Sequence, residues 1–148
     1  MLQLNKFDEI YLEMSWKWLN DPEIKKLTNT PDFKLDVQKK WFTQLKYKKD
    51  YKIWGLSFNG VPIGVCGIKN ITKNDCEYWG YIGEKAYWGQ GLGRGILVHM
   101  ENAARKLVLD SIWLQVIKEN ERAIKLYQKL GYKKVEEKQG LIFMRKML

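Results

Sequence analysis

Four alternating glycines lie between a β-rich run and a helical run, within the segment Trp88–Gly95. Glycine at the start of a helix costs about 0.5 to 1 kcal/mol relative to alanine, unless the backbone needs a positive φ or a ligand must approach closely. A strand that leads through a glycine turn into a helix presents unpaired backbone N–H groups and about half a positive charge. Because this arrangement binds phosphate groups, the segment predicts a phosphate site. The alternative is a tight turn that holds no ligand.

The two common nucleotide-binding motifs do not fit this segment. The dinucleotide fingerprint G-x-G-x-x-G, begun at Gly89 or Gly91, would need glycine where Arg94 or Ile96 stands. The Gly-Lys-Ser/Thr of a P-loop is absent. The turn therefore indicates neither hydride transfer nor nucleotide hydrolysis.

A second segment, Asn120–Tyr132, completes a pattern that resembles the GNAT superfamily of acetyl-CoA-dependent N-acetyltransferases. In that family, an Arg/Gln-x-x-Gly-x-Gly/Ala motif wraps the coenzyme A pyrophosphate, and an Asn-x-x-Ala-x-x-x-Tyr-x-x-x-Gly-Phe/Tyr segment follows. The matching positions here are Gly91 and Gly93 in the first motif and Asn120, Ala123, Tyr127, Gly131 and Tyr132 in the second. Trp88 departs from the pattern, because it stands where Arg or Gln is expected. It supplies a backbone N–H group but not that side chain.

The resemblance implies acetyl-CoA as the cosubstrate. No metal is expected, since His99 is the only histidine and the two cysteines match no zinc pattern. The implied pyrophosphate-binding positions are Gly89, Gln90, Gly91, Gly93 and Arg94. Backbone groups of Tyr81 and Ile82 would pair with the pantetheine arm, and an N–H there would face the thioester carbonyl. Asn120 would either bond the pantetheine arm or only cap its helix.

Acetyl transfer to an amine requires a neutral nucleophile, a polarised carbonyl and a proton for the leaving thiolate. The resemblance implies Tyr127 as the general acid, the alternative being a core tyrosine on a helix. Glu77 is the candidate general base, although it could be a solvated strand residue or an anchor for the substrate ammonium. Glu84 and desolvation of the amine are further alternatives for the base. His99 is expected to be structural, and the lack of a Cys-His or Ser-His-Asp pattern favours direct attack in a ternary complex.

The amine acceptor is the least specified part of the sequence. The stretch Trp16–Ile24 resembles relatives that modify protein N-termini, polyamines or nucleotide-linked amino sugars. Trp16, Trp18 and Trp41 could line a sugar or nucleotide site or could pack helices together. Nearby lysines favour an anionic acceptor, such as a nucleotide sugar, over a cationic polyamine. The resemblance also allows a homodimer through the C-terminal strands.

Two other classes compete with a catalyst. A basic nucleic-acid-binding module would use the net charge and the aromatics, but no recognisable motif for nucleic acid is present. A coenzyme-binding sensor would bind acetyl-CoA without transferring its acetyl group. We therefore expect a small-molecule amine acceptor, no nucleic acid and no membrane.

The elements that must position these residues begin with helices in the N-terminal third. Ile10, Met14 and Trp18 predict one helical face, and Val37, Trp41 and Leu45 predict another. Breaks fall at residues 20–22 and 30–32. From Tyr51 the apolar period changes to two, which indicates strands.

Three of these strands form an antiparallel meander with a tight turn at Asn59 and Gly60. The second strand covers 61–69 and the third covers 76–82, with a bulge expected at Gly80. A helix with Ile96, Met100, Ala103, Ala104 and Leu107 on one face follows the glycine turn.

The run 111–117 should pair in parallel with the third strand, because a long helix separates the two. A short helix near 120–130 and two strands turning near Gly140 complete the chain. The expected fold class is α/β (mixed α+β) and GNAT-like. It has a mixed six- to seven-stranded sheet, one parallel strand pair splayed around acetyl-CoA, and about four flanking helices.

Composition agrees with one globular domain over residues 1–148, which the resemblance implies is an N-acetyltransferase domain. The chain has 148 residues and a net charge of 26 − 17 = +9, and a chain of this size buries roughly two thirds of its unfolded surface. No apolar run approaches a membrane span or a signal peptide, so a cytoplasmic location is expected. Cys66 and Cys76 are expected to be reduced, and their pattern matches no zinc site.

Overall fold

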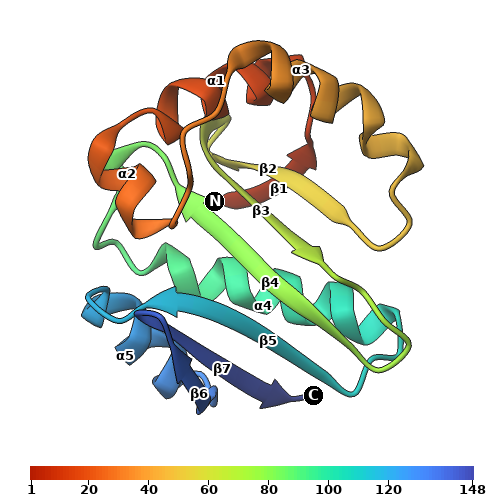
Figure 1. The fold of residues 1–148 in the computed structure, drawn as a ribbon, viewed down its shortest axis with the longest axis vertical. Coiled ribbons are helices and arrows are strands. Elements are labelled where there is room, and N and C mark those ends of the chain that lie inside the picture. Colours follow the sequence, from red (N-terminus) through yellow and green to blue (C-terminus); the bar gives the residue numbers. More distant parts are fainter.

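The computed structural model describes all 148 residues as one seven-stranded mixed sheet with helices on both faces (Figure 1). The strands are β1 (Leu2–Lys6), β2 (Lys52–Phe58), β3 (Val61–Lys69), β4 (Asp75–Ile82), β5 (Ser111–Ile117), β6 (Lys133–Lys138) and β7 (Leu141–Met147). The helices are α1 (Glu9–Leu19), α2 (Pro22–Leu27), α3 (Leu35–Gln44), α4 (Leu92–Lys106) and α5 (Glu121–Lys129). Short 3-10 turns cover Leu45–Tyr47 and Lys85–Tyr87. The strand order is β1-β2-β3-β4-β5-β7-β6.

The predicted meander is confirmed, and a strand that the sequence did not localise extends it. β2, β3 and β4 pair antiparallel, and Asn59 (φ 50°) and Gly60 (φ 83°) form the left-handed turn between the first two. β1 adds to the outer edge of β2, from Leu2 opposite Phe58 to Lys6 opposite Trp54. The five residues of β1 are too few for their apolar alternation to distinguish a strand from the segment that leads into a helix.

The bulge expected at Gly80 is not there. The register between β3 and β4 is unbroken from Gly64 opposite Ile82 to Lys69 opposite Glu77. The irregularity falls in β3 instead, where Ile63 is the extra residue between two pairs with β2. Glycine at position 80 has a packing reason, because an added Cβ would lie 2.7 Å from the Tyr78 hydroxyl.

The parallel pairing of β4 with β5 is confirmed, and it is short. Only Asp75 to Glu77 pair with Ser111 to Trp113, and beyond them the two strands diverge toward their C-terminal ends (Figure 1). Arg145 of β7 holds the paired end together, because its Nη1 donates to Asp75 Oδ2 (3.0 Å) and to Ser111 Oγ (2.7 Å). The strands therefore form a fork that is fixed at one end and open at the other.

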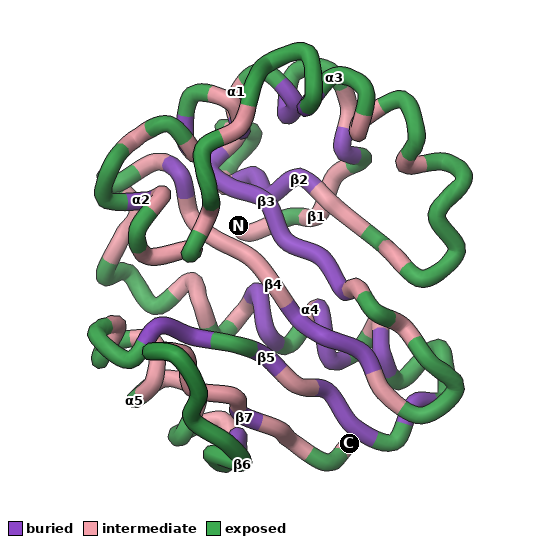
Figure 2. Tube along the Cα trace, in the orientation of Figure 1, coloured by how far each residue is buried: buried purple, intermediate pink, exposed green.

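Two apolar clusters, one on each face of the sheet, make up the core (Figure 2). The larger joins α4 and α5 to the sheet through residues such as Leu97, Met100 and Ile112. The smaller joins α1, α2 and α3 to the other face through residues such as Phe7 and Trp18. Side chains on β4 alternate between the two clusters. One face of the fork is therefore covered by α4 and α5, and the other by α1, α2 and α3.

The first residue of two predicted helix faces is misplaced. Ile10 and Val37 are exposed by 59% and 56%, whereas their neighbours Tyr11 and Gln38 are buried. Gln38 Nε2 donates to Ser15 Oγ (3.0 Å) between α3 and α1. A hydrophobic pattern cannot detect a buried polar pair of this kind. The later positions of both faces are correct, because Trp18 is buried in the smaller cluster and Trp41 packs against it.

Both cysteines are free thiols buried in the core. None of the helices combines the length and hydropathy required to cross a bilayer. No group of three or more His, Cys, Asp or Glu side chains is close enough together to bind a metal ion.

The fold should lose stability steeply above pH 10. Burial raises the pKa of Tyr51, Tyr78, Tyr81 and Tyr132 above that of an exposed phenol. The unfolded state therefore loses these protons first, and the unfolding free energy falls by about 1.4 kcal/mol per pH unit for each such tyrosine above pH 10. Urea unfolding at pH 8 to 11 measures this slope.

Tyr78→Phe should make the slope shallower, since it removes one buried phenol. Tyr47→Phe is the control, because Tyr47 is 73% exposed. Equal slopes in the two variants would contradict the assignment.

Candidate active site

Two cavities open on either side of the fork between β4 and β5. The larger has a volume of about 740 Å³ and runs from β4 to the glycine turn and α5. The smaller, of about 460 Å³, lies among β4, β5 and the loop after α2. Both are lined by Leu27, Thr28, Tyr78, Gly80, Tyr81, Asn120 and Tyr127. A molecule in one cavity can therefore meet a molecule in the other at this shared wall.

The glycine turn forms a cradle of free amides at one end of the larger cavity. Gly89 (φ 74°) and Gly91 (φ 76°) adopt the left-handed conformation that glycine tolerates best. The N–H groups of residues 89–91 have no acceptor in the protein, and Gly91 begins α4 without a side-chain cap. Successive amides in such a turn make a concave anion site, which the start of a helix reinforces.

Four of the five predicted pyrophosphate positions line this cavity: Gly89, Gly91, Gly93 and Arg94. Gln90 does not, because its side chain turns back and its Nε2 donates to the Ala86 carbonyl (2.9 Å). Only the backbone N–H of Gln90 remains available to bind a phosphate at the glycine turn.

The edge of β4 at the fork presents Gly80 and Ile82 rather than Tyr81. The Gly83 N–H donates to the Ile63 carbonyl on β3 (2.7 Å), so strand alternation directs the backbone of Tyr81 toward β3 as well. The N–H of Ile82 faces the fork, but its carbonyl accepts a hydrogen bond from the Trp88 indole (2.8 Å). The predicted pantetheine contacts of Tyr81 and Ile82 stay predictions, and of the two only Ile82 has a backbone N–H that faces the fork. The period of two along the strand pairs Ile82 with Gly80 on that edge.

Asn120 and Tyr127 reach the shared wall from the start and the last turn of α5. Asn120 Oδ1 accepts from the Ala123 N–H (3.3 Å) and caps the helix, while its side-chain NH₂ has no partner in the protein. The Tyr127 hydroxyl likewise has none, and its ring lies edge-on to Tyr78 at 6.5 Å. Burial raises the pKa of Tyr127 to about 12, so the phenol keeps its proton across the physiological range.

Glu77 lies on the other face of β4 and lines the smaller cavity. It is only 4% exposed, so it is not a solvated strand residue. Its carboxylate accepts hydrogen bonds from Asn70 Nδ2 (2.9 Å) and Gln115 Nε2 (3.1 Å). The charge of Glu77, after burial, contributes to the raised pKa of Tyr51, which lines the same cavity.

Several residues considered from the sequence lie outside both cavities. Glu84 accepts a hydrogen bond from the Trp18 indole (2.9 Å), so both have structural partners. Trp16 packs edge-on against Phe33 at 5.2 Å. Trp41 packs against Phe7 and Tyr51. The aromatic side chains that line the smaller cavity are instead Tyr51, Tyr78, Trp79, Tyr81 and Tyr127.

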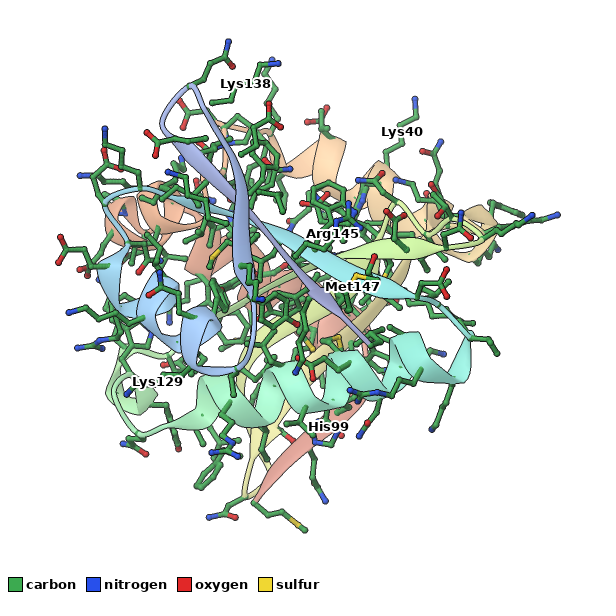
Figure 3. All side chains as sticks on the ribbon, turned by 90° about the horizontal axis from the view of Figure 1, so that it is seen from below. Lys40, His99, Lys129, Lys138, Arg145 and Met147 are labelled. Carbon is green, nitrogen blue, oxygen red and sulfur yellow. The ribbon has the colours of Figure 1, made fainter.

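Neither the two cysteines nor the single histidine line the cavities, so no Cys-His pair is available there for a covalent acetyl-enzyme. Cys66 and Cys76 are fully buried, and burial followed by the charge of Asp75 raises the pKa of Cys76 to about 11. His99 lies half-buried on α4 and lines neither cavity (Figure 3). The geometry thus agrees with direct attack on a thioester.

Arg122 lines the larger cavity although sequence reasoning did not select it. It occupies an unspecified position of the Asn120–Tyr132 segment, in the first turn of α5. Lys69, Asn70 and Gln115 also escaped the sequence reasoning, because only the sheet brings them close to Glu77.

Residues 12–132 match the family model described as the acetyltransferase (GNAT) family. The chain belongs to the GNAT family. A GNAT enzyme takes its acetyl group from acetyl-CoA, so this protein is an acetyl-CoA-dependent N-acetyltransferase, and the free amides of the glycine turn suit the phosphates of that cosubstrate.

Two named GNAT acetyltransferases are similar to this chain in sequence. The chain is 25% identical over 132 residues to acetyltransferase PseH of Campylobacter jejuni, covering 86% of this chain and 82% of PseH. It is 29% identical over 82 residues to the ribosomal protein bS18-alanine N-acetyltransferase of Escherichia coli, covering 55% of each.

Solved structures share the whole GNAT fold. PseH in complex with acetyl coenzyme A superposes with a TM-score of 0.78 at 20% identity, covering 99% of both chains. The spermidine N-acetyltransferase of Vibrio cholerae, in complex with CoA and spermine, gives a TM-score of 0.87 at 17% identity, covering 99% of this chain and 95% of the other.

Gly91→Ala should weaken acetyl-CoA binding by roughly tenfold, which corresponds to about 1.4 kcal/mol, because a Cβ disfavours the left-handed turn that aims the amides. Calorimetric titration with acetyl-CoA measures the change. Gly60→Ala is a matched control, since Gly60 also has a positive φ, has open space around it and lies in the β2–β3 turn. An equal loss of affinity in both variants would argue against a binding role for the turn.

Proposed function

We propose that this N-acetyltransferase acetylates the amine of a nucleotide-linked amino sugar by direct attack in a ternary complex. The observation that carries the proposal is the shared wall of the two cavities. An amide cradle for phosphates lies on one side of it, and a buried carboxylate lies on the other. The proposal treats residues 1–148 as one N-acetyltransferase domain.

Backbone groups would make most of the contacts with the cosubstrate. The amides of Gly89, Gln90 and Gly91 would bind the diphosphate, with Gly93 and Arg94 completing the first turn of α4. The free side-chain NH₂ of Asn120 would donate to the pantetheine arm.

The free edge of β4 would complete the cosubstrate site. Its Ile82 N–H, like that of Gly80, would face the pantetheine arm and the thioester carbonyl. An N–H fixed in place before reaction polarises that carbonyl without reorganisation.

Tyr127 is the proposed general acid. Its hydroxyl has no partner in the protein and lies in the shared wall, where a leaving thiolate would form. With a pKa of about 12 the phenol is weakly acidic, so its proton would move only as the thiolate develops negative charge.

Glu77 is the proposed general base for the acceptor ammonium. Hydrogen bonds from Asn70 and Gln115 hold its carboxylate in a fixed orientation. From there it would take a proton from the amine directly or through one water.

The charges of the smaller cavity support a sugar over a polyamine. Glu77 and Lys69 are the charged side chains that line it, so a polyamine would meet a single carboxylate and one repelling cation. Lys69 takes part in no ion pair, although it lies opposite Glu77 in the sheet register. A free cation beside aromatic rings suits a phosphate-bearing sugar, whereas a polyamine or a protein N-terminus remains the alternative acceptor.

The C-terminal edge of the sheet is exposed. β6 is the edge strand of the sheet, and all six of its residues are exposed. Figure 3 shows Lys138 at the outer tip of its hairpin with β7. An exposed edge of this kind can pair with a second copy, so we propose a homodimer through the C-terminal strands. We also propose a cytoplasmic location for the enzyme, as expected from the sequence.

A thiol-release assay with acetyl-CoA tests the acceptor class. The panel is a nucleotide-linked amino sugar, the free amino sugar, spermidine and a peptide with a free N-terminus. We expect the highest kcat/KM for the nucleotide-linked amino sugar and intersecting initial-rate lines. A preference for spermidine would overturn the acceptor class, and parallel lines would overturn direct attack.

Tyr127→Phe should lower kcat by about 100- to 10,000-fold while the Kd for acetyl-CoA changes little, because only the proton donor is lost. Tyr47→Phe is the control on an exposed tyrosine. Since the pKa of Tyr127 is about 12, wild-type kcat should show no alkaline decline below pH 10. Unchanged turnover in Tyr127→Phe would remove the acid role.

A further inference from the structure

The first position of the pyrophosphate motif has lost its usual function in this chain. Trp88 stands where the family has Arg or Gln. Its only polar side-chain atom, the indole N–H, already donates to the Ile82 carbonyl (2.8 Å). The glycine turn therefore receives no polar side-chain group from this position.

A guanidinium from a different element lies beside the same turn. Arg122 Nη1 is 3.7 Å from the position that a Cβ on Gly89 would occupy. Arg122 also lines the larger cavity and takes part in no ion pair. Its charge is thus free to meet an anion held by the amides of residues 89–91.

The packing of α5 on α4 places the start of α5, which carries the exposed Arg122, beside the glycine turn. Leu126 presses on α4 so closely that a Cβ on Gly93 would lie 2.7 Å from its Cδ2. Residues four apart lie on one face of a helix, so Arg122 precedes Leu126 by one turn along α5. Gly89 precedes Gly93 by the same number of residues along the chain. The contact at Gly93 therefore holds the first turn of α5 near the glycine turn, within reach of the Arg122 guanidinium.

We propose that Arg122 supplies the side-chain contact to the coenzyme phosphates that Trp88 cannot make. The inference rests on the proposed orientation of acetyl-CoA along the glycine turn. A guanidinium presents several N–H donors in a planar fork that matches phosphate oxygens, and such charge-assisted bonds are stronger than neutral ones. Because α5 also carries Tyr127, a phosphate held by Arg122 would set the thioester in register with the proposed acid.

The test compares Arg122→Gln with wild type on three acetyl donors: acetyl-CoA, its 3′-dephospho form and S-acetyl-pantetheine, which has no phosphate. We expect the KM and Kd for acetyl-CoA to rise about tenfold or more, in the range of a lost charge-assisted hydrogen bond. The KM for S-acetyl-pantetheine should stay unchanged, because this donor offers no phosphate to the guanidinium. Arg122→Lys should restore part of the affinity.

The matched control is Lys125→Gln, which removes the same charge from an exposed position of α5. This variant should leave the KM for all three acetyl donors unchanged. A loss in Arg122→Gln that persists with the dephospho form assigns the contact to the diphosphate, and a loss confined to acetyl-CoA assigns it to the 3′-phosphate.

Two results would overturn the inference. One is an unchanged KM for acetyl-CoA in Arg122→Gln. The other is an equal rise in KM for S-acetyl-pantetheine, which would mean that Arg122 only supports the fold of α5. Failure of the wild-type protein to bind acetyl-CoA in calorimetry would instead refute the proposed cosubstrate site at the glycine turn. A failure of the proposed function is thus distinguishable from a failure of the Arg122 inference.

Discussion

The site depends on one interrupted strand pairing. β4 and β5 share a parallel ladder for three residues each and then separate, which leaves backbone groups of β4 without a protein partner. Buried backbone groups in this state are costly unless something else satisfies them. An extended pantetheine arm has amide groups that can do so. The open fork is therefore a defect in the sheet, and under the proposed function it is where the cosubstrate would bind.

Contacts at the closed end keep this interruption in one place. The Arg145 guanidinium bridges Asp75 on β4 and Ser111 on β5. One step further along, Gln115 of β5 donates to Glu77 of β4 at the point where the ladder ends. Because the second of these bonds involves the proposed base, the same contact that limits the fork also orients the group facing the acceptor.

The two faces of β4 divide the chemistry. Tyr78, Gly80 and Ile82 belong to the face covered by α4 and α5, where the amide cradle, Arg122 and Tyr127 lie. Glu77, Trp79 and Tyr81 belong to the face covered by α1 to α3, and they line the smaller cavity. The two substrates would thus approach from opposite sides of one strand and meet only at the wall that both cavities share.

The sequence by itself determined the family, the order of most elements and the backbone cradle, since these follow from local signals: positive-φ glycines, apolar periods and a fixed Asn-to-Tyr spacing. It could not place Ile10 and Val37 on the exposed side, remove Glu84 and the helix tryptophans from the site, or find Arg122, Asn70 and Gln115. The hydrogen-bond partners of Glu77 and Glu84 lie between 7 and 66 residues away along the chain. The position of Arg122 depends on the packing of α5 against α4. Only the tertiary structure decides such contacts, because a side chain's period along its own element carries no information about which other element packs against it.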